Sequence, residues 1–172
     1  MSTLVDWQIA ERCGTESLIS PYTAEQLNPA SYDVLLGDEI LLEVLSDYGD
    51  KKRTWLSFDL ETGPYILSPG EFILGCTREI VKIPNDLEAI FCLKSSRGRE
   101  GYDHALAAYI DPGFEGRVTL ELHNMNRYNG LVLTSGMRIG QLRFASLAER
   151  PEKSYSQTGR YHGDMGPAPS RG

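Results

Sequence analysis

Eight residues in the middle of the chain, 94–101 (KSSRGREG), combine the side chains that an anion site needs. They hold two small hydroxyls, glycine and three cations, between an apolar run over 87–93 and a strand-like run over 104–110. Successive backbone N–H groups in a turn form a concavity for an anion, and nearby Lys and Arg side chains add positive charge. The stretch therefore predicts a loop that binds a polyphosphate. A charged, solvated hairpin loop is an equal alternative at this point, because loops rich in Lys and Arg are common.

A carboxylate that could transfer protons lies downstream, in the stretch 117–123 (RVTLELH). Apolar and polar residues alternate there as in a strand with one buried face, and Glu121 is on the polar face. A solvent-facing carboxylate is the simplest interpretation. If this strand pairs near 104–110, however, Glu121 would reach Ser95 and Arg99 at the mouth of the expected loop. A partly desolvated carboxylate in such a cleft can act as a general acid and base.

Short strands must position these residues. From residue 64 onward, apolar or alternating runs are separated by turn signals rich in Gly, Pro, Asn and Asp. Many short strands with little helix predict an all-β fold, a sandwich or barrel, in one domain over residues 1–150. The expected strands cover 31–37, 40–45, 65–67, 72–77, 80–83, 87–93, 104–110, 117–123, 130–133 and 138–144.

Upstream segments add a little helix. A short N-terminal helix is expected over 4–12, with Thr3 as its N-cap and Gly14 as its stop, and one helical turn over 23–27. The polar residues 46–54 predict a hairpin tip whose Lys and Arg side chains are solvated.

The C-terminal segment, residues 151–172, has almost no aliphatic side chains, so it cannot bury enough apolar surface to order itself alone. A flexible tail is one interpretation. The segment also carries cations and aromatic rings spaced by glycine, which suit a lid that closes over an anionic, ring-bearing ligand. These residues are Lys153, Tyr155, Arg160, Tyr161, His162 and Arg171.

Composition limits the classes of partner. The chain has 172 residues, 41% of them hydrophobic, and a net charge of −7, which suits a globular domain and argues against a nucleic-acid polymer as partner. Its three cysteines lack CxxC spacing, so we expect neither a disulfide framework nor a zinc cluster, and a reducing, cytoplasmic setting. No apolar run approaches the about 20 residues of a membrane span, and the first residues lack a signal-peptide pattern.

A series of motifs resembles the dCTP deaminase branch of the dCTP deaminase/dUTPase superfamily. The motifs are KSSRGREG, AAYIDPGFEGRVTLELHN, SGMRIGQLRF and GRYHGDMGPAPSR, preceded by NPASYDVLLGDEI and LSPGEFILG, and together they cover nearly the whole chain from about residue 29. The resemblance implies a distorted β-barrel, or jelly roll, of the dUTPase-like type. It also implies a homotrimer with active sites at subunit interfaces, and hydrolytic deamination of dCTP to dUTP and ammonia.

The resemblance implies catalytic roles for three residues. Glu121 matches the family's catalytic Glu, which activates water and returns protons to the ring nitrogen and the leaving amine. Ser95 and Arg99 match residues that position the water and stabilise charge on the ring. Zinc is not expected, because the chain lacks the HxE and PCxxC ligands of zinc deaminases. Mg²⁺ is expected to accompany the triphosphate without any side-chain ligand.

The same motifs imply the substrate contacts. Asp111 matches the Asp that receives the deoxyribose 3′-hydroxyl, although Asp in an Asp-Pro-Gly turn also caps local backbone groups. Tyr109 beside it would disfavour a 2′-hydroxyl. Arg160 stands where the family usually has Lys, and both side chains bind phosphate. The other implied contacts are Lys94, Ser96, Arg97, Gly98, Ala107, Thr119, Gln141, Tyr155, Tyr161 and Asp164.

Three positions depart from the family pattern. Leu106 replaces a common Thr, Arg97 replaces an apolar residue, and Asp164 replaces a Gln that helps hold the cytosine or the phosphates. An ionised Asp accepts hydrogen bonds but cannot donate them, so it suits an exocyclic amine and repels phosphate. Either the base is a modified cytosine, or the tail binds in an altered register.

The sequence leaves alternatives open. A deaminase that also hydrolyses the triphosphate is one, and a dUTPase alone is another. Single-function dUTPases, however, lack a Glu that matches Glu121 and end in a different Gly-rich tail. A nucleotide-sensing β-barrel without turnover is also compatible with Leu106 and Asp164. A structural or sugar-binding jelly roll would give the phosphate loop and the basic tail no role.

Overall fold

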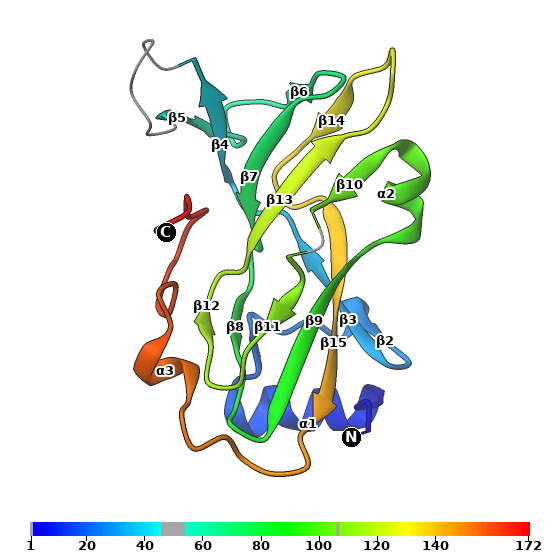
Figure 1. Ribbon diagram of the computed structural model, residues 1–172. Coiled ribbons are helices and arrows are strands. Elements are labelled where there is room, and N and C mark those ends of the chain that lie inside the picture. Colours follow the sequence, from blue (N-terminus) through cyan, green and yellow to red (C-terminus); the bar gives the residue numbers. More distant parts are fainter. Residues whose placement is uncertain (1, 46–53, 106) are drawn as a thin grey trace.

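The computed structural model describes residues 2–45, 54–105 and 107–172, and these residues have the all-β architecture that was expected (Figure 1). Two five-stranded sheets have the strand orders β10-β13-β7-β4-β5 and β11-β9-β15-β3-β2; smaller sheets have the orders β1-β8-β12 and β14-β6. The strands are β1 (Ile19–Ser20), β2 (Leu27–Asn28), β3 (Ser31–Leu35), β4 (Glu39–Val44), β5 (Thr54–Asp59), β6 (Tyr65–Leu67), β7 (Phe72–Cys76), β8 (Ile80–Lys82), β9 (Leu87–Leu93), β10 (Tyr102–His104), β11 (Tyr109–Ile110), β12 (Glu115–Gly116), β13 (Thr119–Asn124), β14 (Leu131–Leu133) and β15 (Arg138–Ser146). The helices are α1 (Asp6–Glu16), η1 (Ala24–Gln26), α2 (Ser95–Glu100) and α3 (Tyr155–Thr158). None of the helices in these ranges is long and apolar enough to cross a membrane.

Alternate residues of the strands build the hydrophobic core. In β13, Leu120 and Leu122 are fully buried, whereas Thr119 and Glu121 face the other way and are half-buried. Burying a leucine side chain contributes about 1.5–3 kcal/mol, so a one-residue shift of the strand, which would exchange its two faces, is strongly disfavoured. The predicted alternation over 117–123 is confirmed, and it fixes the side of the sheet on which Glu121 lies.

The segment 104–110 was predicted to be one strand, and this prediction is wrong. Its first residue belongs to β10, which pairs with β13, and its last residues belong to β11, which pairs with β9. These two strands lie in different sheets, so the chain crosses from one sheet to the other here. The crossing leaves no mark in the alternation of residues, because each short strand has the same local pattern.

Residues 94–101 contain a helix where a loop was predicted. Helix α2 follows Lys94, whose backbone is extended, and ends at Gly101 in the left-handed region (φ 104°). The N–H of Gly101 donates to the carbonyl of Gly98 at 3.2 Å. Glycine adopts this conformation at low cost. A single short helix therefore replaces the concave turn that was expected.

Helix α1 begins and ends later than the predicted helix over 4–12. Its N-cap is Val5 rather than Thr3. Gly14 does not stop the helix, which continues to the left-handed Ser17 (φ 57°). A glycine inside a helix costs only about 1 kcal/mol, which burial of the helix's apolar face can outweigh.

The remaining predictions have mixed outcomes. Helix η1 confirms the predicted turn over 23–27. Strand β11 lies within the predicted run 104–110, whereas β5, α3 and the other two-residue strands were not predicted. The hairpin-tip prediction covers residues 46–54, of which 46–53 lie outside the described residues and Thr54 begins β5. Leu106 also lies outside the described residues. The division of the chain at residue 150 stays a prediction.

Candidate active site

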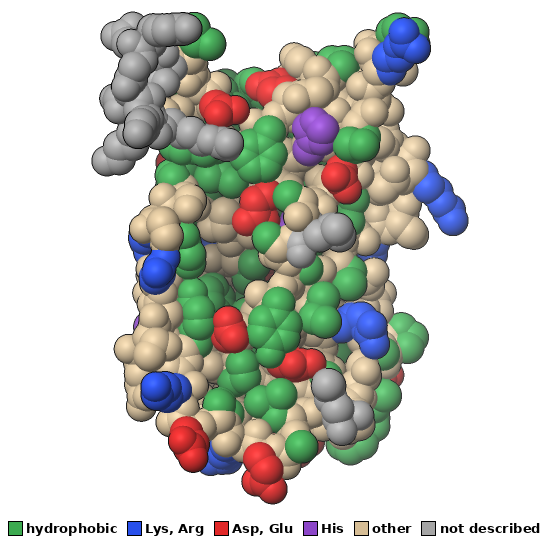
Figure 2. Space-filling model, in the orientation of Figure 1, with side chains coloured by type: hydrophobic (Ala, Val, Ile, Leu, Met, Phe, Trp, Pro, Cys, Tyr) green, Lys and Arg blue, Asp and Glu red, His purple; other side chains and the backbone are tan. Residues whose placement is uncertain are grey.

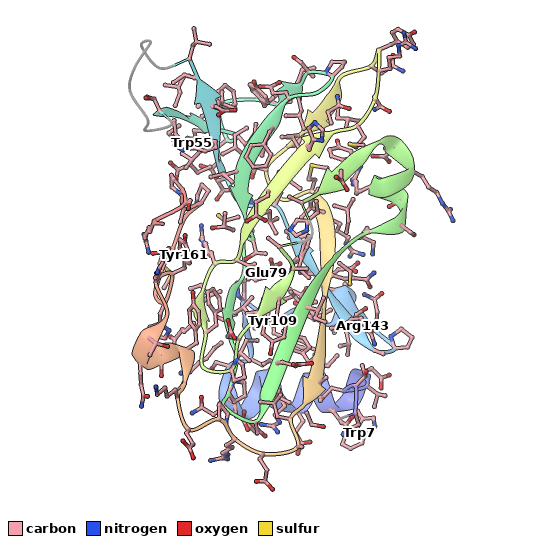
Figure 3. All side chains as sticks on the ribbon, in the orientation of Figure 1. Trp7, Trp55, Glu79, Tyr109, Arg143 and Tyr161 are labelled. Carbon is pink, nitrogen blue, oxygen red and sulfur yellow. The ribbon has the colours of Figure 1, made fainter. Side chains whose placement is uncertain are left out.

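A cavity of about 650 Å³ opens beside the polar face of β13. Figure 2 shows this face of the molecule hollowed between the C-terminal segment and the strands, and Figure 3 shows Tyr161, Trp55 and Tyr109 placed around it. The wall combines aromatic and small apolar side chains with a few charged groups. The lining residues are Trp55, Phe72, Leu74, Ala107, Tyr109, Ile110, Asp111, Phe114, Arg117, Val118, Thr119, Glu121, Tyr155, Tyr161, Asp164, Ala168, Pro169 and Ser170.

Glu121 is the partly desolvated carboxylate of this cavity. Its side chain is 26% exposed, and burial raises its pKa. In the described part of the chain, its Oε2 atom is buried and has no hydrogen-bond partner. The nearest basic group is His104 on β10, whose Nε2 lies 3.4 Å from that oxygen. Burial thus favours the protonated form of Glu121 more than in an exposed glutamate, a shift in the direction that a general acid and base requires.

His104 is a residue that the sequence did not single out. Its side chain is 6% exposed, burial lowers its pKa, and its ring packs on Phe91 with the ring centroids 4.6 Å apart. His104 lies close to Glu121 because β10 pairs with β13, and no local pattern around His104 predicts the register of that pairing.

Asp111, Tyr109 and Ala107 reach the cavity because the chain crosses between the sheets just before them. Burial raises the pKa of Asp111. Tyr109 is 54% exposed, and its hydroxyl donates to Glu88 at 2.9 Å. Burial and this hydrogen bond raise the pKa of Tyr109 to about 12, so it stays a neutral phenol beside Asp111.

The C-terminal segment packs against the cavity instead of extending into solvent. Backbone hydrogen bonds join it to the β12 region, from Gly163 N–H to the Glu115 carbonyl (2.7 Å) and from Arg117 N–H to the Asp164 carbonyl (2.8 Å). Further along, Ala168 N–H donates to the Thr119 hydroxyl at 3.1 Å. The C-terminal segment is therefore docked along the edge of the cavity.

Asp164 is held by a contact within this segment. Its Oδ1 accepts from Arg171 at 2.8 Å, and the Arg171 guanidinium lies 5.1 Å from the centre of the Tyr161 ring. Arg171 also donates to the Arg160 carbonyl. The Oδ2 atom of Asp164 is buried without a hydrogen-bond partner among the described residues. The Arg160 side chain is exposed and does not line the cavity among those residues.

Helix α2 carries the other group of predicted site residues. Ser95, Ser96, Gly98 and Arg99 are exposed there, and Figure 1 shows α2 on the opposite side of β13 from the C-terminal segment. Strand β13 does pair with β10, as the expected contact required, yet Ser95 and Arg99 are not among the described residues that line the cavity. Within a single chain, Ser95 and Arg99 therefore do not share the cavity of Glu121.

Ion pairs and hydrogen bonds fix the side chains around α2. Lys94 pairs with the buried Asp33 at 2.5 Å. Arg97 pairs with Glu100 at 2.7 Å and donates to the Arg138 carbonyl at 3.0 Å. Gln141 accepts from the Ser31 hydroxyl at 2.7 Å. Among the described residues, Lys94, Arg97 and Gln141 are not part of the cavity lining.

A family model described as dCTP deaminase-like matches residues 3–147. The chain belongs to the dCTP deaminase-like family. Relatives named "dCTP deaminase, dUMP-forming" include that of Rhodococcus opacus, 38% identical over 166 residues (89% of this chain and 86% of the relative). That of Dictyoglomus thermophilum is 40% identical over 158 residues (86% and 81%).

Solved structures show the same fold. The 2′-deoxycytidine 5′-triphosphate deaminase of Agrobacterium tumefaciens matches 84% of this dCTP deaminase-like chain with a TM-score of 0.68 and 23% identity. The chain spans about half of that protein, 48% of its length. The dUTPase-like fold that the resemblance implied is confirmed, as a set of open sheets rather than one closed barrel in the described residues.

Proposed function

We propose that the protein is an enzyme that hydrolytically deaminates dCTP. The observation that carries this proposal is the carboxylate of Glu121, desolvated and without a hydrogen-bond partner among the described residues, in a cavity of about 650 Å³. A cavity of this size suits a nucleotide. Relatives that cover most of the chain are named as dCTP deaminases.

Glu121 would carry the proton transfers. As a carboxylate it takes a proton from water, whose oxygen attacks C4 of the cytosine ring, and it passes that proton to the ring nitrogen N3. It then transfers a second proton from the added hydroxyl to the exocyclic amine, which leaves as ammonia while the C4 carbonyl forms. Each transfer needs a group whose pKa lies near the working pH. Burial raises the pKa of Glu121 and so brings it closer to that pH.

The cavity also offers a place for the sugar. The carboxylate of Asp111 can accept from a 3′-hydroxyl, and the neutral ring of Tyr109 next to it restricts the space for a 2′-hydroxyl. Ala107 and Thr119 line the same cavity as Asp111 and Glu121. A deoxyribonucleotide therefore fits this wall with its base toward Glu121.

We further propose that the enzyme is a homotrimer whose active sites combine two subunits. Ser95 and Arg99 would position the water and stabilise ring charge, yet they lie on α2, away from the cavity of their own chain. A neighbouring subunit must then supply them. Lys94, Ser96, Arg97, Gly98 and Gln141 would come with them to bind phosphates, together with Tyr155, Tyr161 and Arg160 of the tail.

Mg²⁺ would arrive with the triphosphate. Among the described residues, no three His, Cys, Asp or Glu side chains are grouped to hold a metal ion. An ion that keeps waters and phosphate oxygens as its ligands needs no such group, so the residues present are compatible with it. When bound, the ion would neutralise part of the charge of the phosphates.

The product after deamination is a second question, because relatives are named as dUMP-forming. A product screen answers it together with the main proposal: purified protein is incubated with dCTP, 5-methyl-dCTP, dCMP or dUTP and Mg²⁺, and products are separated by chromatography. Deamination predicts a uracil-type nucleotide from a cytosine triphosphate, and pyrophosphate appears if the triphosphate is also cleaved. Cleavage of dUTP alone would identify a dUTPase. Calorimetric binding of dCTP without turnover would identify a nucleotide sensor.

A further inference from the structure

Two buried polar atoms face each other without other partners beside the cavity. They are Nε2 of His104 and Oε2 of Glu121, 3.4 Å apart, and neither makes a hydrogen bond with another described residue. Leaving a buried polar atom unpaired is unfavourable, because the atom loses its hydrogen bonds to water and gains none in return. Two such atoms at this distance can satisfy each other if one proton lies between them.

The backbone holds both side chains in place. His104 pairs with Leu122 across β10 and β13, and Ala105 N–H donates to the Glu121 carbonyl at 3.2 Å. The imidazole is fixed from its other side by the Phe91 ring. Other charged groups near the pair are Asp103, next to His104, and Asp111, Arg117 and Asp164 around the cavity. His104 is thus a rigid group and Glu121 is the acidic group that it contacts.

The charge state of the imidazole decides what the contact does. Burial lowers the pKa of His104, so the ring is neutral at neutral pH and carries its single N–H on either Nδ1 or Nε2. With the proton on Nε2, the ring donates to the Glu121 carboxylate. With the proton on Nδ1, Nε2 could only accept from a protonated Glu121.

We propose that His104 is a positioning residue for Glu121, and that its Nε2–H holds Oε2 so that Oε1 alone faces the attacking water. This proposal rests on the proposed deamination. The Glu121 side chain is 26% exposed while its Oε2 is buried, so Oε1 is the oxygen that a ligand can reach. One oxygen would thus be fixed, and the other would carry every proton. Catalytic hydrogen bonds are often long in the absence of substrate and shorten when it binds.

The proposal makes the donor at position 104 matter, rather than its bulk. His104→Phe keeps a ring against Phe91 but removes the N–H. His104→Gln places an amide N–H near the position of Nε2. His123→Gln is the matched control, because His123 lies on β13 near this pair but does not line the cavity in the described residues.

We expect H104F to lower kcat for dCTP by about tenfold or more with KM changed less than about twofold. H104Q should recover most of kcat, and H123Q should match the wild type. Equal kcat in H104F and wild type would overturn the proposal, as would equal losses in H104F and H104Q.

A titration that needs no activity separates this proposal from the deaminase proposal. The carboxyl of Glu121 is followed by ¹³C NMR in labelled protein, with Glu121→Gln to assign its signal. Loss of a donor to the carboxylate should move the Glu121 titration to higher pH in H104F but not in H123Q. No movement, or movement to lower pH, would overturn the role of His104 even if wild type deaminates dCTP. If wild type does not deaminate dCTP, the proposed function fails and the titration alone decides the contact.

A further measurement covers the case in which H104F does not fold. The ¹⁵N shifts of the wild-type imidazole report which nitrogen carries the proton. A proton on Nε2 supports the proposal, and a proton on Nδ1 overturns it.

Discussion

Glu121 illustrates how burial converts an ordinary strand carboxylate into a group that can do chemistry. A carboxylate on the polar face of a strand normally faces water and stays ionised. Here the C-terminal segment, Tyr109 and Leu74 surround the cavity that Glu121 lines, and burial raises its pKa. In the described residues no cation forms a short ion pair that would lower that pKa again, since the nearby His104 is disfavoured as a cation by its own burial. Desolvation therefore decides the state of Glu121.

The pH dependence of the reaction should reflect this. Glu121 must be ionised to accept the proton of water, so kcat/KM for dCTP should fall as pH falls through its raised pKa, by about tenfold per pH unit. The acid limb should therefore lie at higher pH than for an exposed Glu. A pH–rate profile, with circular dichroism at each pH to confirm folding, measures this. A flat profile down to the range of an exposed Glu would contradict the assignment.

Asp164 should set the preference for an amine on the base. Its Oδ2 is buried and unpaired in the described residues, while Arg171 compensates its charge. An ionised carboxylate accepts from the 4-amino group of cytosine and is repelled by the 4-oxo group of uracil.

We expect Asp164→Asn to reduce the preference for dCTP over dUTP by about tenfold, as measured by calorimetry with the Glu121→Gln background to prevent turnover. Asp103→Asn is the control, because Asp103 is exposed on β10 and does not line the cavity in the described residues. An unchanged preference in the Asp164 variant would place that side chain away from the base.

At the scale of elements, the C-terminal segment closes one side of the cavity by pairing with β12. This requires close approach of two backbones at Gly116, which has a φ of 149°. A Cβ atom there would lie 2.6 Å from the carbonyl oxygen of Asp164. Only glycine leaves room for the segment at this point.

Gly116→Ala should therefore displace the C-terminal segment. We expect KM for dCTP to rise about tenfold, since Tyr161 and Asp164 would leave the ligand. Gly63→Ala is the control, because Gly63 also has a positive φ (154°) but no atom within 4 Å of an added Cβ. Steady-state kinetics and thermal unfolding of both variants test this. Equal kinetics in the two variants would show that close contact at Gly116 is not needed.

Elements differed in how far the sequence could predict them. Strand β13 was predictable, because Leu120 and Leu122 alternate with polar residues and one register alone buries them. Helix α2 was not predictable, because its sequence, SSRGRE, has no apolar periodicity. The end of the helix depends on the left-handed conformation of Gly101. The position of His104 depends on the register in which β10 pairs with β13, which is tertiary information. The rings and cations of the tail suggested a place beside a ligand, but the sequence could not show its hydrogen bonds to the β12 region.

At the scale of the whole molecule, the predicted site residues fall into two groups on opposite sides of β13. Glu121, Asp111 and the tail surround the cavity, whereas Ser95 and Arg99 lie on α2. No sequence pattern could show this separation, because it arises only when the sheets pack. An assembly that brings α2 of one subunit to the cavity of the next would unite both groups.

Mixing two inactive variants tests that assembly. Glu121→Gln and Arg99→Ala should each be inactive alone. Co-expressed in equal amounts, they should regain about a quarter of the wild-type sites, those that combine an intact Glu121 from one subunit with an intact Arg99 from another. No regained activity in a mixed oligomer, verified by mass spectrometry, would contradict a site shared between subunits.

The most direct test of the whole account follows ammonia and nucleotide products from dCTP with wild type and Glu121→Gln. The account expects wild type to release one ammonia for each uracil-type nucleotide formed. Glu121→Gln should lose at least about a hundredfold in rate while still binding dCTP in calorimetry. An unchanged cytosine amine with wild type, or undiminished ammonia release with Glu121→Gln, would contradict it.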